Sequence, residues 1–430
     1  MDFAIKRPAE LQRIDDPPMT GLASLARHAF AGGHFSDEIA ALLRRVAGDA
    51  RDASALLDLS IIERLRGNAA NGDALQAAAI DMRKLFSLAA CPEAGAPRLL
   101  VFVAPGGFMS NTPVEFLLEG RRASVDLLFV DERSAMPSPL PPCDVAMVAV
   151  AESKDNLAIL EKLARAGLDR RPLINPPERV ARLSRDGAWR LLGNSPGVRY
   201  PENRLVSRQE LSNISRGRTR VNELLHDADF PIIARPVDSH AGENLSKIDD
   251  ADALALWLAG LEGDEFFIAP FVDYSDARGA FRKYRVALVE GRPFAVHMAI
   301  STRWMVHYLN ADMMDNSDNR REEERFFEAF EADFAARHAI AFAALADAAG
   351  LDYMLIDCAE SVDGQLLVFE VGTAMIAHTL DCPDLFPYKA RNMEKLFDAF
   401  YAMICRKAAK TPASNGAGST FPIRRRAGAQ

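Results

Sequence analysis

The stretch that decides the fold runs from Tyr353 to His378 and reads YMLIDCAESVDGQLLVFEVGTAMIAH. It holds two apolar runs typical of β-strands, separated by Asp363-Gly364, a dipeptide typical of a two-residue hairpin turn. If this dipeptide forms the tip and the two strands pair without interruption, Asp357 lies directly opposite Glu370. The stretch therefore predicts a β-hairpin that carries one carboxylate on each arm.

Two carboxylates that face each other across a ladder need a reason to be there, because like charges directly opposite destabilise the pairing. A raised pKa that keeps one group protonated would remove the repulsion. A divalent cation bound between the two groups would also remove it. We favour the metal, and we predict that Asp357 and Glu370 are its ligands.

Cationic side chains occur in the strands that precede this hairpin. FPIIARPV places Arg235 at the end of an apolar strand, ahead of a loop that contains Gly242. FRKYRVALVEGRPFAVH indicates a second hairpin that turns at Glu290-Gly291, with Lys283 and Arg285 on one face. Cations and loop amides of this kind bind phosphate oxygens. Phosphoryl transfer needs such groups together with carboxylate-bound magnesium, so the sequence predicts a site for ATP and Mg²⁺.

Several neighbouring residues are secondary candidates. Arg303, in STRWMVHYLNADM, is expected to add a further cation, and EFFIAPFVDY is a suitable connector for contacting a purine through its backbone. His378 follows the hairpin and either lines a substrate pocket or caps a helix; we favour the pocket. His297 is expected to face away from Arg285, because the side chains of a strand alternate between its two faces.

Size and composition restrict the class of protein. A chain of 430 residues is expected to form two or three domains. Its formal net charge of -9, without a long basic stripe, argues against a nucleic-acid partner. The five cysteines are scattered, which predicts neither a zinc site nor a disulfide framework and favours a cytoplasmic location. No apolar run approaches the roughly 18 residues of a membrane span.

The chain divides into four predicted segments. Residues 1–95 are expected to be helical, and SALLDLSIIERLRGNAANGDALQAAAIDMRKLF indicates two helices broken at Gly67 to Gly72. This pair resembles a tetratricopeptide-type hairpin with Ala74 and Ala78 as close-packing positions, but an ordinary helical cap on the next domain is equally consistent. Continuous apolar runs from Arg98 onward predict a parallel α/β domain over residues 96–200.

Residues 201–406 mix strands and helices, and residues 407–430 are small, polar and basic, which predicts a disordered tail. In the α/β segment, Ala104 to Gly107 (APGG) follows a strand and either cradles a phosphate or forms a tight strand exit. We favour the strand exit, since the G-x-G-x-x-G fingerprint is absent. The fold class is therefore a multidomain α/β and α+β protein with an N-terminal helical region.

The order of the segments carries a family resemblance. INPPERVARLSRDGAWRLL, FPIIARPV, FFIAPFVDY, FRKYRVALVEGRPFAVH, LIDCAE and LLVFEVGTA follow one another as in the ATP-grasp ligases, particularly the glutathione-synthetase-like and ribosomal-protein-glutamate-ligase-like members. The resemblance covers roughly residues 98 to 400. It implies a pre-ATP-grasp α/β domain and two subdomains that hold ATP between antiparallel sheets. It also implies that ATP phosphorylates a substrate carboxylate and that an amine attacks the acyl phosphate.

The resemblance also implies roles for single residues. Arg285 matches the arginine that contacts the γ-phosphate, residues 268 to 272 match the adenine-contacting connector, and Asp357 and Glu370 match magnesium ligands. The candidate site residues are Arg285 and Arg303 for catalysis, Arg185, Arg235, Gly242, Ala269, Phe271, Asp273 and Lys283 for nucleotide binding, and Asp357 and Glu370 for metal binding.

Three positions depart from the family pattern. Gly187 stands where the family usually has a lysine, although Arg185 is close enough in sequence to reach into the site. Arg235 replaces a second lysine, which keeps the charge and changes its geometry. Gly372 falls on the position of a metal-binding asparagine, which water or Thr373 would have to replace.

The leading hypothesis from the sequence is an ATP-dependent carboxylate-amine ligase that acts on a small acid, amino acid or peptide. Its partners would be small carboxylate and amine substrates, with a protein or peptide recruited by the N-terminal helices, and neither nucleic acid nor membrane. The alternative is a catalytically degenerate ATP-grasp scaffold that binds nucleotide and acts through its helical region. Resemblance of fold alone does not identify the substrate.

Overall fold

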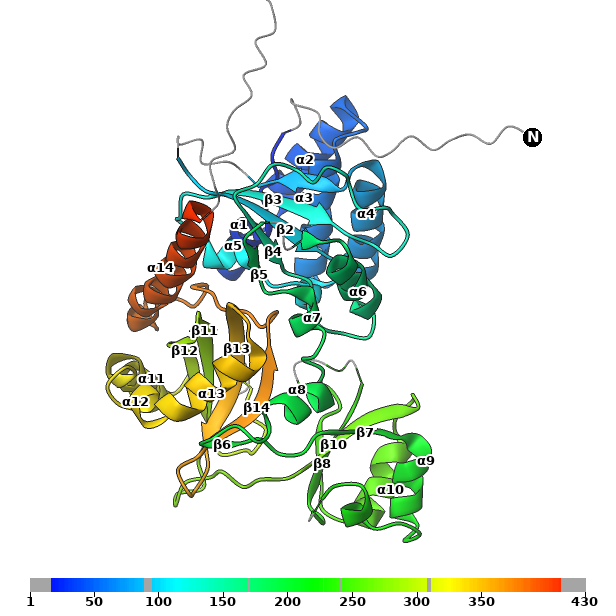
Figure 1. The fold of residues 1–430 in the computed structure, drawn as a ribbon, viewed down its shortest axis with the longest axis vertical. Coiled ribbons are helices and arrows are strands. Elements are labelled where there is room, and N and C mark those ends of the chain that lie inside the picture. Colours follow the sequence, from blue (N-terminus) through cyan, green and yellow to red (C-terminus); the bar gives the residue numbers. More distant parts are fainter. Residues whose placement is uncertain are drawn as a thin grey trace, which may run out of the picture.

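The computed structural model describes residues 17–88, 95–168, 171–226, 228–237, 239, 242–307 and 311–410. A parallel sheet with the N-terminal helices forms the upper part of the molecule in Figure 1, and two antiparallel sheets form the lower part. This arrangement confirms the predicted multidomain mixture of helices and sheets. No helix in these ranges is both long enough and apolar enough to cross a membrane.

The upper sheet has the strand order β1-β3-β2-β4-β5. Strands β2 to β5 are parallel, and β1 pairs antiparallel with β3. Because both faces are covered, β2 is buried from its second residue onward, which explains its continuous apolar run. The elements of this part are β1 (Leu85–Ser87), β2 (Arg98–Val103), β3 (Ser124–Phe129), β4 (Val145–Val148), β5 (Leu173–Ile174), α5 (Val114–Leu117), α6 (Leu157–Arg165) and α7 (Pro177–Val180).

The N-terminal helices belong to the same packing unit as this sheet. They are α1 (Leu22–Phe30), α2 (Ser36–Gly48), α3 (Ala53–Leu65) and α4 (Ala69–Met82), and they lead directly into β1. Leu57 of α3, Ile80 of α4 and Phe86 of β1 share one buried cluster with Val101 of β2. The helical region is therefore fastened to the α/β sheet by a common core.

The helix break and the close-packing positions differ from the sequence prediction. Gly72 lies inside α4, where an added Cβ would come within 3.0 Å of the Ser60 carbonyl oxygen of α3. The small residue that lets the two helices approach is therefore Gly72, with the fully buried Ala79 about two turns further along the same face of α4. Ala74 is exposed, so it does not serve the predicted role.

The smaller of the two lower sheets has the order β7-β10-β8-β9 and is antiparallel throughout. Two helices cover one face and share its apolar cluster. Its elements are β7 (Arg204–Ser207), β8 (Ile232–Pro236), β9 (Ser246–Ile248), β10 (Glu265–Pro270), α9 (Arg208–Ser215) and α10 (Ala251–Ala259).

The larger lower sheet has the order β12-β11-β13-β14-β6. Its antiparallel strands are joined at one edge by β6, which runs parallel to β14 although it precedes the predicted domain boundary at residue 200. The elements are β6 (Val198–Arg199), β11 (Phe281–Val289), β12 (Arg292–Ser301), β13 (Tyr353–Glu360), β14 (Leu366–Gly372), α8 (Arg185–Leu192), α11 (Ser317–Ala329), α12 (Phe334–Arg337) and α13 (Ala339–Ala349).

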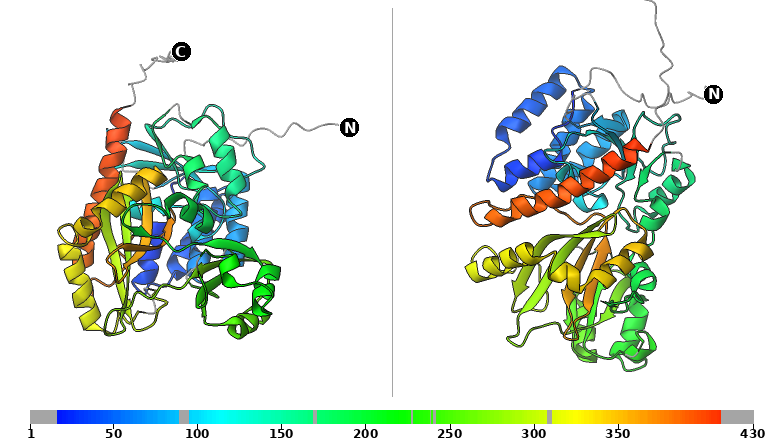
Figure 2. Two further views of the ribbon diagram at one scale, coloured as in Figure 1. Left: turned by 60° about the horizontal axis from the view of Figure 1, so that its bottom comes forward. Right: turned by 60° about the vertical axis from the view of Figure 1, so that its left-hand side comes forward.

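Several contacts join the upper and lower parts. Asn175, directly after β5, accepts a hydrogen bond from the Tyr353 backbone amide at the start of β13 and donates one to its carbonyl oxygen. The long helix α14 (Pro387–Ala409) lies between the upper and lower parts (Figure 2) and contacts β11, β12 and β4. Residues 407–409, predicted to begin the tail, are helical; residues 411–430 lie outside the described residues.

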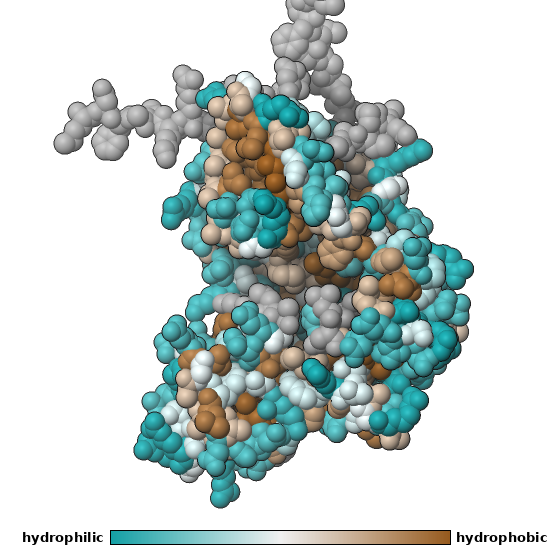
Figure 3. Space-filling view, turned by 180° about the vertical axis from the view of Figure 1, so that it is seen from behind, coloured by the Kyte–Doolittle hydropathy of each residue, from teal (hydrophilic) through white to brown (hydrophobic). Residues whose placement is uncertain are grey.

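The face opposite to that of Figure 1 is hollowed between the upper and lower parts (Figure 3). A short contact ties the two parts together beside the smaller lower sheet. Lys154, which follows β4, forms a 2.9 Å ion pair with Glu265, whose carbonyl oxygen accepts a hydrogen bond from Val237 just after β8. The carboxyl end of β4 therefore lies next to the end of β8, and ligands of α/β sheets bind beyond such carboxyl ends.

Candidate functional site

The ladder between β13 and β14 places Asp357 opposite Glu370, as the sequence predicts. The tip of this hairpin is wider than a two-residue turn. The Ser361 amide donates a hydrogen bond to the Gln365 carbonyl oxygen, which leaves a loop of three residues, Val362–Gly364. A three-residue loop with a left-handed glycine is a common hairpin type. Without a further irregularity in the ladder, this three-residue loop would shift the pairing of β13 with β14 by one residue.

A β-bulge restores the predicted pairing. Cys358 pairs with Val368, whereas Asp357 pairs with Glu370, so Phe369 is the extra residue of β14. Bulges often lie beside functional sites, where they redirect a side chain. The bulge at Phe369 turns the Glu370 carboxylate to the same face as Asp357. The correct prediction of this pair thus depended on two shifts that cancel each other.

A second bulge overturns the prediction for His297. The hairpin of β11 and β12 turns at Glu290–Gly291 with two positive φ angles of 48° and 79°, as expected of its two-residue turn. Further along, Val296 is left out of the ladder, so His297 pairs with Arg285. His297 therefore lies on the face of Arg285, whereas simple alternation placed it on the other face.

The two bulges align four polar residues across four adjacent strands. His297 of β12, Arg285 of β11, Asp357 of β13 and Glu370 of β14 are direct ladder partners in that order. Directly paired residues point to one face of a sheet. We call these four residues the charged row. The side chains that contact the charged row decide what the site can bind.

Asp357 is held by cations of the protein itself. It is buried, with 2% of its surface exposed. Arg285 Nε and Nη2 donate hydrogen bonds to its two carboxylate oxygens at 2.7 and 3.1 Å, and Lys283 Nζ lies 2.6 Å from Oδ2. Burial alone would raise the pKa of Asp357, but Arg285 and Lys283 outweigh it and hold the pKa well below its usual range. Two side-chain cations therefore relieve the repulsion that the sequence assigned to a metal.

Glu370 is the more open of the two carboxylates, with 41% of its side chain exposed. Arg185, the first residue of α8, donates from Nη2 to Glu370 Oε1 at 2.9 Å and so reaches into the site as predicted. Burial by the surrounding groups would raise the pKa of Glu370, but Arg185 and other cations lower it. Both carboxylates of the charged row are therefore ionised at neutral pH.

Arg235, in β8 of the smaller sheet, lies close to Glu370 of the charged row. Only 8% of its surface is exposed, and burial, together with nearby Arg185, lowers its pKa to about 10. Its guanidinium donates to Ser239, from Nε to Oγ at 2.9 Å and from Nη2 to the carbonyl oxygen. Among the described residues, no carboxylate forms an ion pair with it. A buried cation without an ion-pair partner favours the binding of an anion from solution.

The four cations Arg185, Arg235, Lys283 and Arg285 thus surround two carboxylates. Counted over the described residues, the surplus is two positive charges, at a place where two sheets meet. Such a surplus attracts polyanions. The arrangement can hold a chain of phosphates.

The predicted adenine connector, residues 268 to 272, begins within β10 and extends beyond its end. Ala269 is buried in the strand, while Phe271, just beyond it, meets Trp304 edge-to-face with ring centroids 5.9 Å apart. Lys247 Nζ lies 4.7 Å from the centroid of the Phe271 ring. Asp273 is exposed and accepts a hydrogen bond from the Ser275 amide at 2.9 Å, so it is not drawn toward the charged row.

Two other candidates lie in loops near the connector. Gly242 has φ 80°, and a Cβ there would approach Met305 Sδ to 3.2 Å, which places the loop after β8 against the segment after β12. Arg303, in that segment, is exposed, and its guanidinium bonds to no other described residue. The structure therefore brings Gly242 beside this segment but does not connect Arg303 to the charged row.

The metal prediction depends on which ligands are present. Within the described ranges, no group of three or more histidine, cysteine, aspartate or glutamate side chains gathers into a metal site. Asp357 and Glu370 supply two carboxylates, and Gly372 supplies no side chain. Thr373 Oγ1 is buried and bonds to no described residue. Magnesium is usually held by one or two carboxylates together with phosphates and water, so these residues fit an ion that binds with a nucleotide.

Sequence reasoning missed three side chains of the site. Tyr200 is buried beside Arg185 and Glu370, and burial, with Glu370 adding to it, raises its pKa. His307 is close enough to Lys283 and Arg285 that, after burial itself, they lower its pKa. Ser239 bonds Arg235. Ser239 and His307 lie in loops that follow strands assigned to the site, whereas Tyr200 had no such signal in the sequence.

Comparisons with known proteins give similarity at the level of structure. Neither a family model nor a curated protein sequence matches the chain. The structure is similar to D-alanine–D-alanine ligase from Bacillus anthracis complexed with ATP, with 14% identity and a TM-score of 0.44 over 74% of this chain and 100% of that chain.

Two further solved structures are similar to the chain. VanG D-Ala:D-Ser ligase from Enterococcus faecalis has 12% identity and a TM-score of 0.44 over 72% of this chain and 99% of that chain. A RimK domain protein ATP-grasp from Sphaerobacter thermophilus has 14% identity and a TM-score of 0.42 over 72% of this chain and 98% of that chain. The function proposed below rests on the side chains described above.

Proposed function

We propose that the protein is an ATP-dependent carboxylate-amine ligase of the ATP-grasp type. The observation that carries this proposal is the charge surplus of the site. Arg185, Arg235, Lys283 and Arg285 surround only two carboxylates, and Arg235 is buried without an ion-pair partner among the described residues. A triphosphate supplies the missing negative charge between the two sheets.

The two cations that contact Asp357 have a second role in this proposal. Lys283 and Arg285 hold Asp357 in the nucleotide-free protein, and both are long enough to turn from the carboxylate toward a phosphate oxygen. Asp357 and Glu370 would then hold Mg²⁺ together with the phosphates. The ion, when bound, supplies positive charge for the transferring phosphoryl group. Fixed charges placed where negative charge develops are a major source of catalysis.

The proposed reaction has two steps. A carboxylate oxygen of the acid substrate attacks the terminal phosphorus, the bond to ADP breaks, and an acyl phosphate forms. The nitrogen of the amine substrate then attacks the acyl carbon, inorganic phosphate leaves, and the amine loses a proton as the amide forms. Arg285 and Lys283 would offset charge on the moving phosphoryl group.

The other parts of the nucleotide and the substrates have candidate places. The backbone around Ala269 and the Phe271 ring, beside Trp304 and Lys247, would contact adenine. The acid and the amine would bind at the carboxyl edge of the upper sheet, since the Lys154–Glu265 contact places that edge next to the end of β8. The cysteines within the described ranges are free thiols, which supports a cytoplasmic location.

A second candidate function is a nucleotide-binding scaffold without turnover. Gly372 favours it, because that position offers no side-chain ligand for a metal. Arg185 and Arg235 add to this reading, since an arginine does not reproduce the geometry of a lysine at a phosphate.

A screen with the full chain separates the two candidates. ATP and Mg²⁺ are incubated with pairs of amino acids, amines and short peptides, and both ADP release and product mass are measured. A ligase gives ADP and a product whose mass equals the sum of the two substrates less one water. Tight nucleotide binding without ADP release for any pair would favour the scaffold, and no nucleotide binding would overturn both.

A further inference from the structure

We propose that helix α1 positions Arg285 through the segment Ile376–Leu380. The N-terminal helices are then a structural part of the site, in addition to any role in binding a partner. This inference rests on the proposed function insofar as Arg285 contacts the terminal phosphate. The contact between α1 and the segment is tested separately.

The first link joins Arg285 to the segment. While Nε and Nη2 of Arg285 face Asp357, its Nη1 donates a 3.2 Å hydrogen bond to the Ile376 carbonyl oxygen. The guanidinium is thus fixed by a carboxylate on one side and by backbone on the other. If a nucleotide draws Asp357 away toward a metal, the carbonyl of Ile376 remains as the anchor that sets the direction of Arg285.

The second link joins the segment to α1 by apolar packing. Ile376 and Leu380 pack against a buried cluster of Ala23 and Ala26 of α1 and Phe116 of α5. The His378 ring lies between two aromatic rings of the same helices, with centroids 6.1 Å from both Phe30 and Phe116. Helix α1 therefore packs against the segment Ile376–Leu380, which in turn contacts Arg285 of the charged row.

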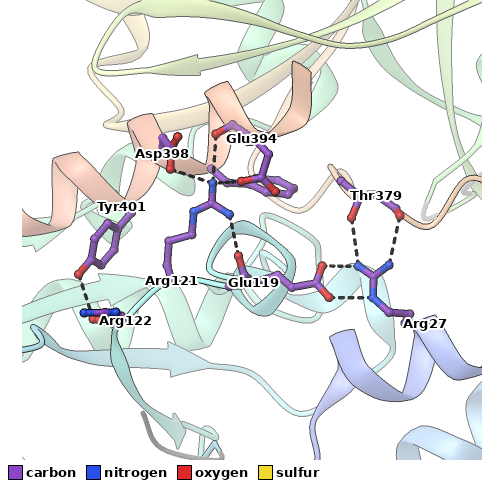
Figure 4. A pocket seen from close by; sticks show the side chains of 10 residues that line it. Arg27, Glu119, Arg121, Arg122, Thr379, Glu394, Asp398 and Tyr401 are labelled. Atoms are coloured by element: carbon purple, nitrogen blue, oxygen red, sulfur yellow. Dashed lines mark hydrogen bonds and ion pairs between the residues drawn. The ribbon is translucent and has the colours of Figure 1, made fainter. Parts of the chain in front are cut away.

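The third link is polar. Arg27 of α1 donates to the Thr379 side-chain oxygen at 3.0 Å and to the Thr379 carbonyl oxygen at 3.4 Å, and it also pairs with Glu119 (Figure 4). Figure 4 shows Arg27 reaching from α1 to Thr379 and Glu119 at the same time. One arginine therefore fixes the segment against both α1 and the turn after α5.

A related contact comes from α4. Gln76 accepts a 2.8 Å hydrogen bond from the Gly106 amide and donates a 3.2 Å bond to the Gly106 carbonyl oxygen. This pair fixes the glycine turn after β2, at the carboxyl edge where substrates are expected. Two N-terminal helices thus hold two loops of the site, and loss of either contact would loosen a loop without removing a charged group.

The expected effect follows from the tolerance of catalytic geometry. A displacement of about 1 Å of a catalytic group, caused by a change far from the chemistry, can cost about 100-fold in rate. Nucleotide affinity depends on several cations, whereas the orientation of Arg285 depends on Ile376. Loosening α1 should therefore change the segment and Arg285 before it changes ATP binding.

The experiment compares Arg27→Met with wild type in the full chain by hydrogen exchange and mass spectrometry. Methionine keeps most of the apolar stem and removes the bonds to Thr379. Without nucleotide, backbone exchange over residues 376–380 should be at least about fivefold faster in the variant. Arg44→Met is the matched control, because Arg44 is an exposed arginine of the neighbouring helix α2, and exchange should not change.

A second measurement tests the coupling to Arg285. In wild type, Mg²⁺ with a non-hydrolysable ATP analogue should slow exchange in α1, because coupling between sites is reciprocal. This slowing should disappear in Arg27→Met and in the double variant Arg27→Met/Thr379→Val, while the Kd for the analogue stays within about twofold. A purely structural role of Arg27 would lower the melting temperature without removing a nucleotide-dependent signal.

Unchanged exchange over residues 376–380 in both Arg27→Met and the double variant would overturn the inference. If the ATP analogue slows hydrogen exchange in α1 equally in wild type and in Arg27→Met, the inference is overturned as well. If the analogue does not bind to wild type at all, the proposed function fails, and the nucleotide-free exchange still decides whether α1 holds the segment.

Discussion

Two arginine-rich regions of this protein differ in one respect that matters for function. The pocket of Figure 4, about 510 Å³ in volume, contains Arg121, whose side chain is 7% exposed and pairs with Glu394 and Asp398. The site at the charged row contains Arg235, which is 8% exposed and bonds only to Ser239 among the described residues. Both arginine side chains are largely buried, but Arg121 is balanced by two acids, whereas no carboxylate of the described residues pairs with Arg235.

From this difference we infer that an unbalanced positive charge marks the ligand site. In the pocket, Arg27 is matched by Glu119 just as Arg121 is matched by its two acids, so an incoming anion would have to break existing pairs. At the charged row, four cations face two acids. In the proposed function, an anion there would complete a set of ion pairs that the described residues leave incomplete.

The largest expected effect is on stability and comes from Asp357→Asn. The variant leaves Lys283 and Arg285 close together without their acid, and loss of one member of a buried ion pair costs roughly 3 kcal/mol. Urea unfolding should show this loss, and the Mg²⁺ dependence of ATP binding should disappear. In the pocket, Asp398→Asn removes an acid that is 75% exposed and should cost less than about 0.5 kcal/mol. Equal losses in the two variants would break the comparison.

The next effect concerns nucleotide affinity. In the proposed site, Arg235→Met would remove a buried, charge-assisted contact to phosphate, so the Kd for ATP with Mg²⁺ should rise about 100-fold, which corresponds to about 2.7 kcal/mol. Isothermal titration calorimetry measures the change. Arg121→Met is the matched control, since it removes another arginine with a largely buried side chain, this one from the pocket, and its Kd should stay within about twofold of wild type. A reversed order of the two effects would refute the assignment of the site.

A smaller effect, on the pH dependence of stability, comes from the docking of α1. Burial, with nearby Asp58, raises the pKa of Glu115 to about 7 from its ordinary value of 4.5. The folded protein therefore holds an extra proton between pH 4.5 and 7, and Glu115 makes stability fall with rising pH there, by up to about 1.4 kcal/mol per pH unit.

Outside that window, Glu115 contributes no slope. Glu115→Gln should flatten the fall, measured as melting temperature or urea midpoint at several pH values. Glu119→Gln is a suitable control, as this acid of the same region pairs with Arg27 and is partly exposed. A slope that survives in Glu115→Gln would show that the pKa of another group is responsible.

The smallest effect is expected at Lys154. It lies near the end of β8, but it pairs with Glu265, and both side chains are exposed. Lys154→Ala should change stability by less than about 0.5 kcal/mol and the Kd for ATP by less than about twofold. A large loss of affinity in calorimetry would mean that proximity to the charged row matters more than an unbalanced charge.

The sequence was most informative where local pattern fixes the structure. Continuous apolar runs predicted the buried parallel strands, and alternation placed Lys283 and Arg285 on one face. The register of the hairpins could not be predicted from the sequence. An extra residue such as Val296 or Phe369 does not change the hydrophobic alternation recognisably over so short a stretch. These unforeseen bulges account for both outcomes. The pairing of Asp357 with Glu370 was predicted correctly because the bulge at Phe369 cancels the shift made by the turn. The face of His297 was predicted wrongly because the bulge at Val296 was not foreseen.

Contacts between distant segments were also beyond sequence reasoning. Strand β1 is three residues long, so its pairing with β3, which fastens the N-terminal helices to the upper sheet, gives almost no periodic signal. The bond from Arg285 to Ile376 and the bond from Arg27 to Thr379 depend on how the chain returns from β14 to α14. Such contacts follow from tertiary packing, which local propensity does not encode.

The most direct test of the central claim is a crystal structure with Mg²⁺ and a non-hydrolysable ATP analogue. We predict phosphate oxygens within hydrogen-bond distance of the Arg235 guanidinium and Mg²⁺ bound by Asp357 and Glu370. Lys283 or Arg285 should have turned from Asp357 toward the phosphates. An analogue bound in the pocket of Arg27 and Arg121, or phosphates that leave Arg235 bonded only to Ser239, would contradict the account.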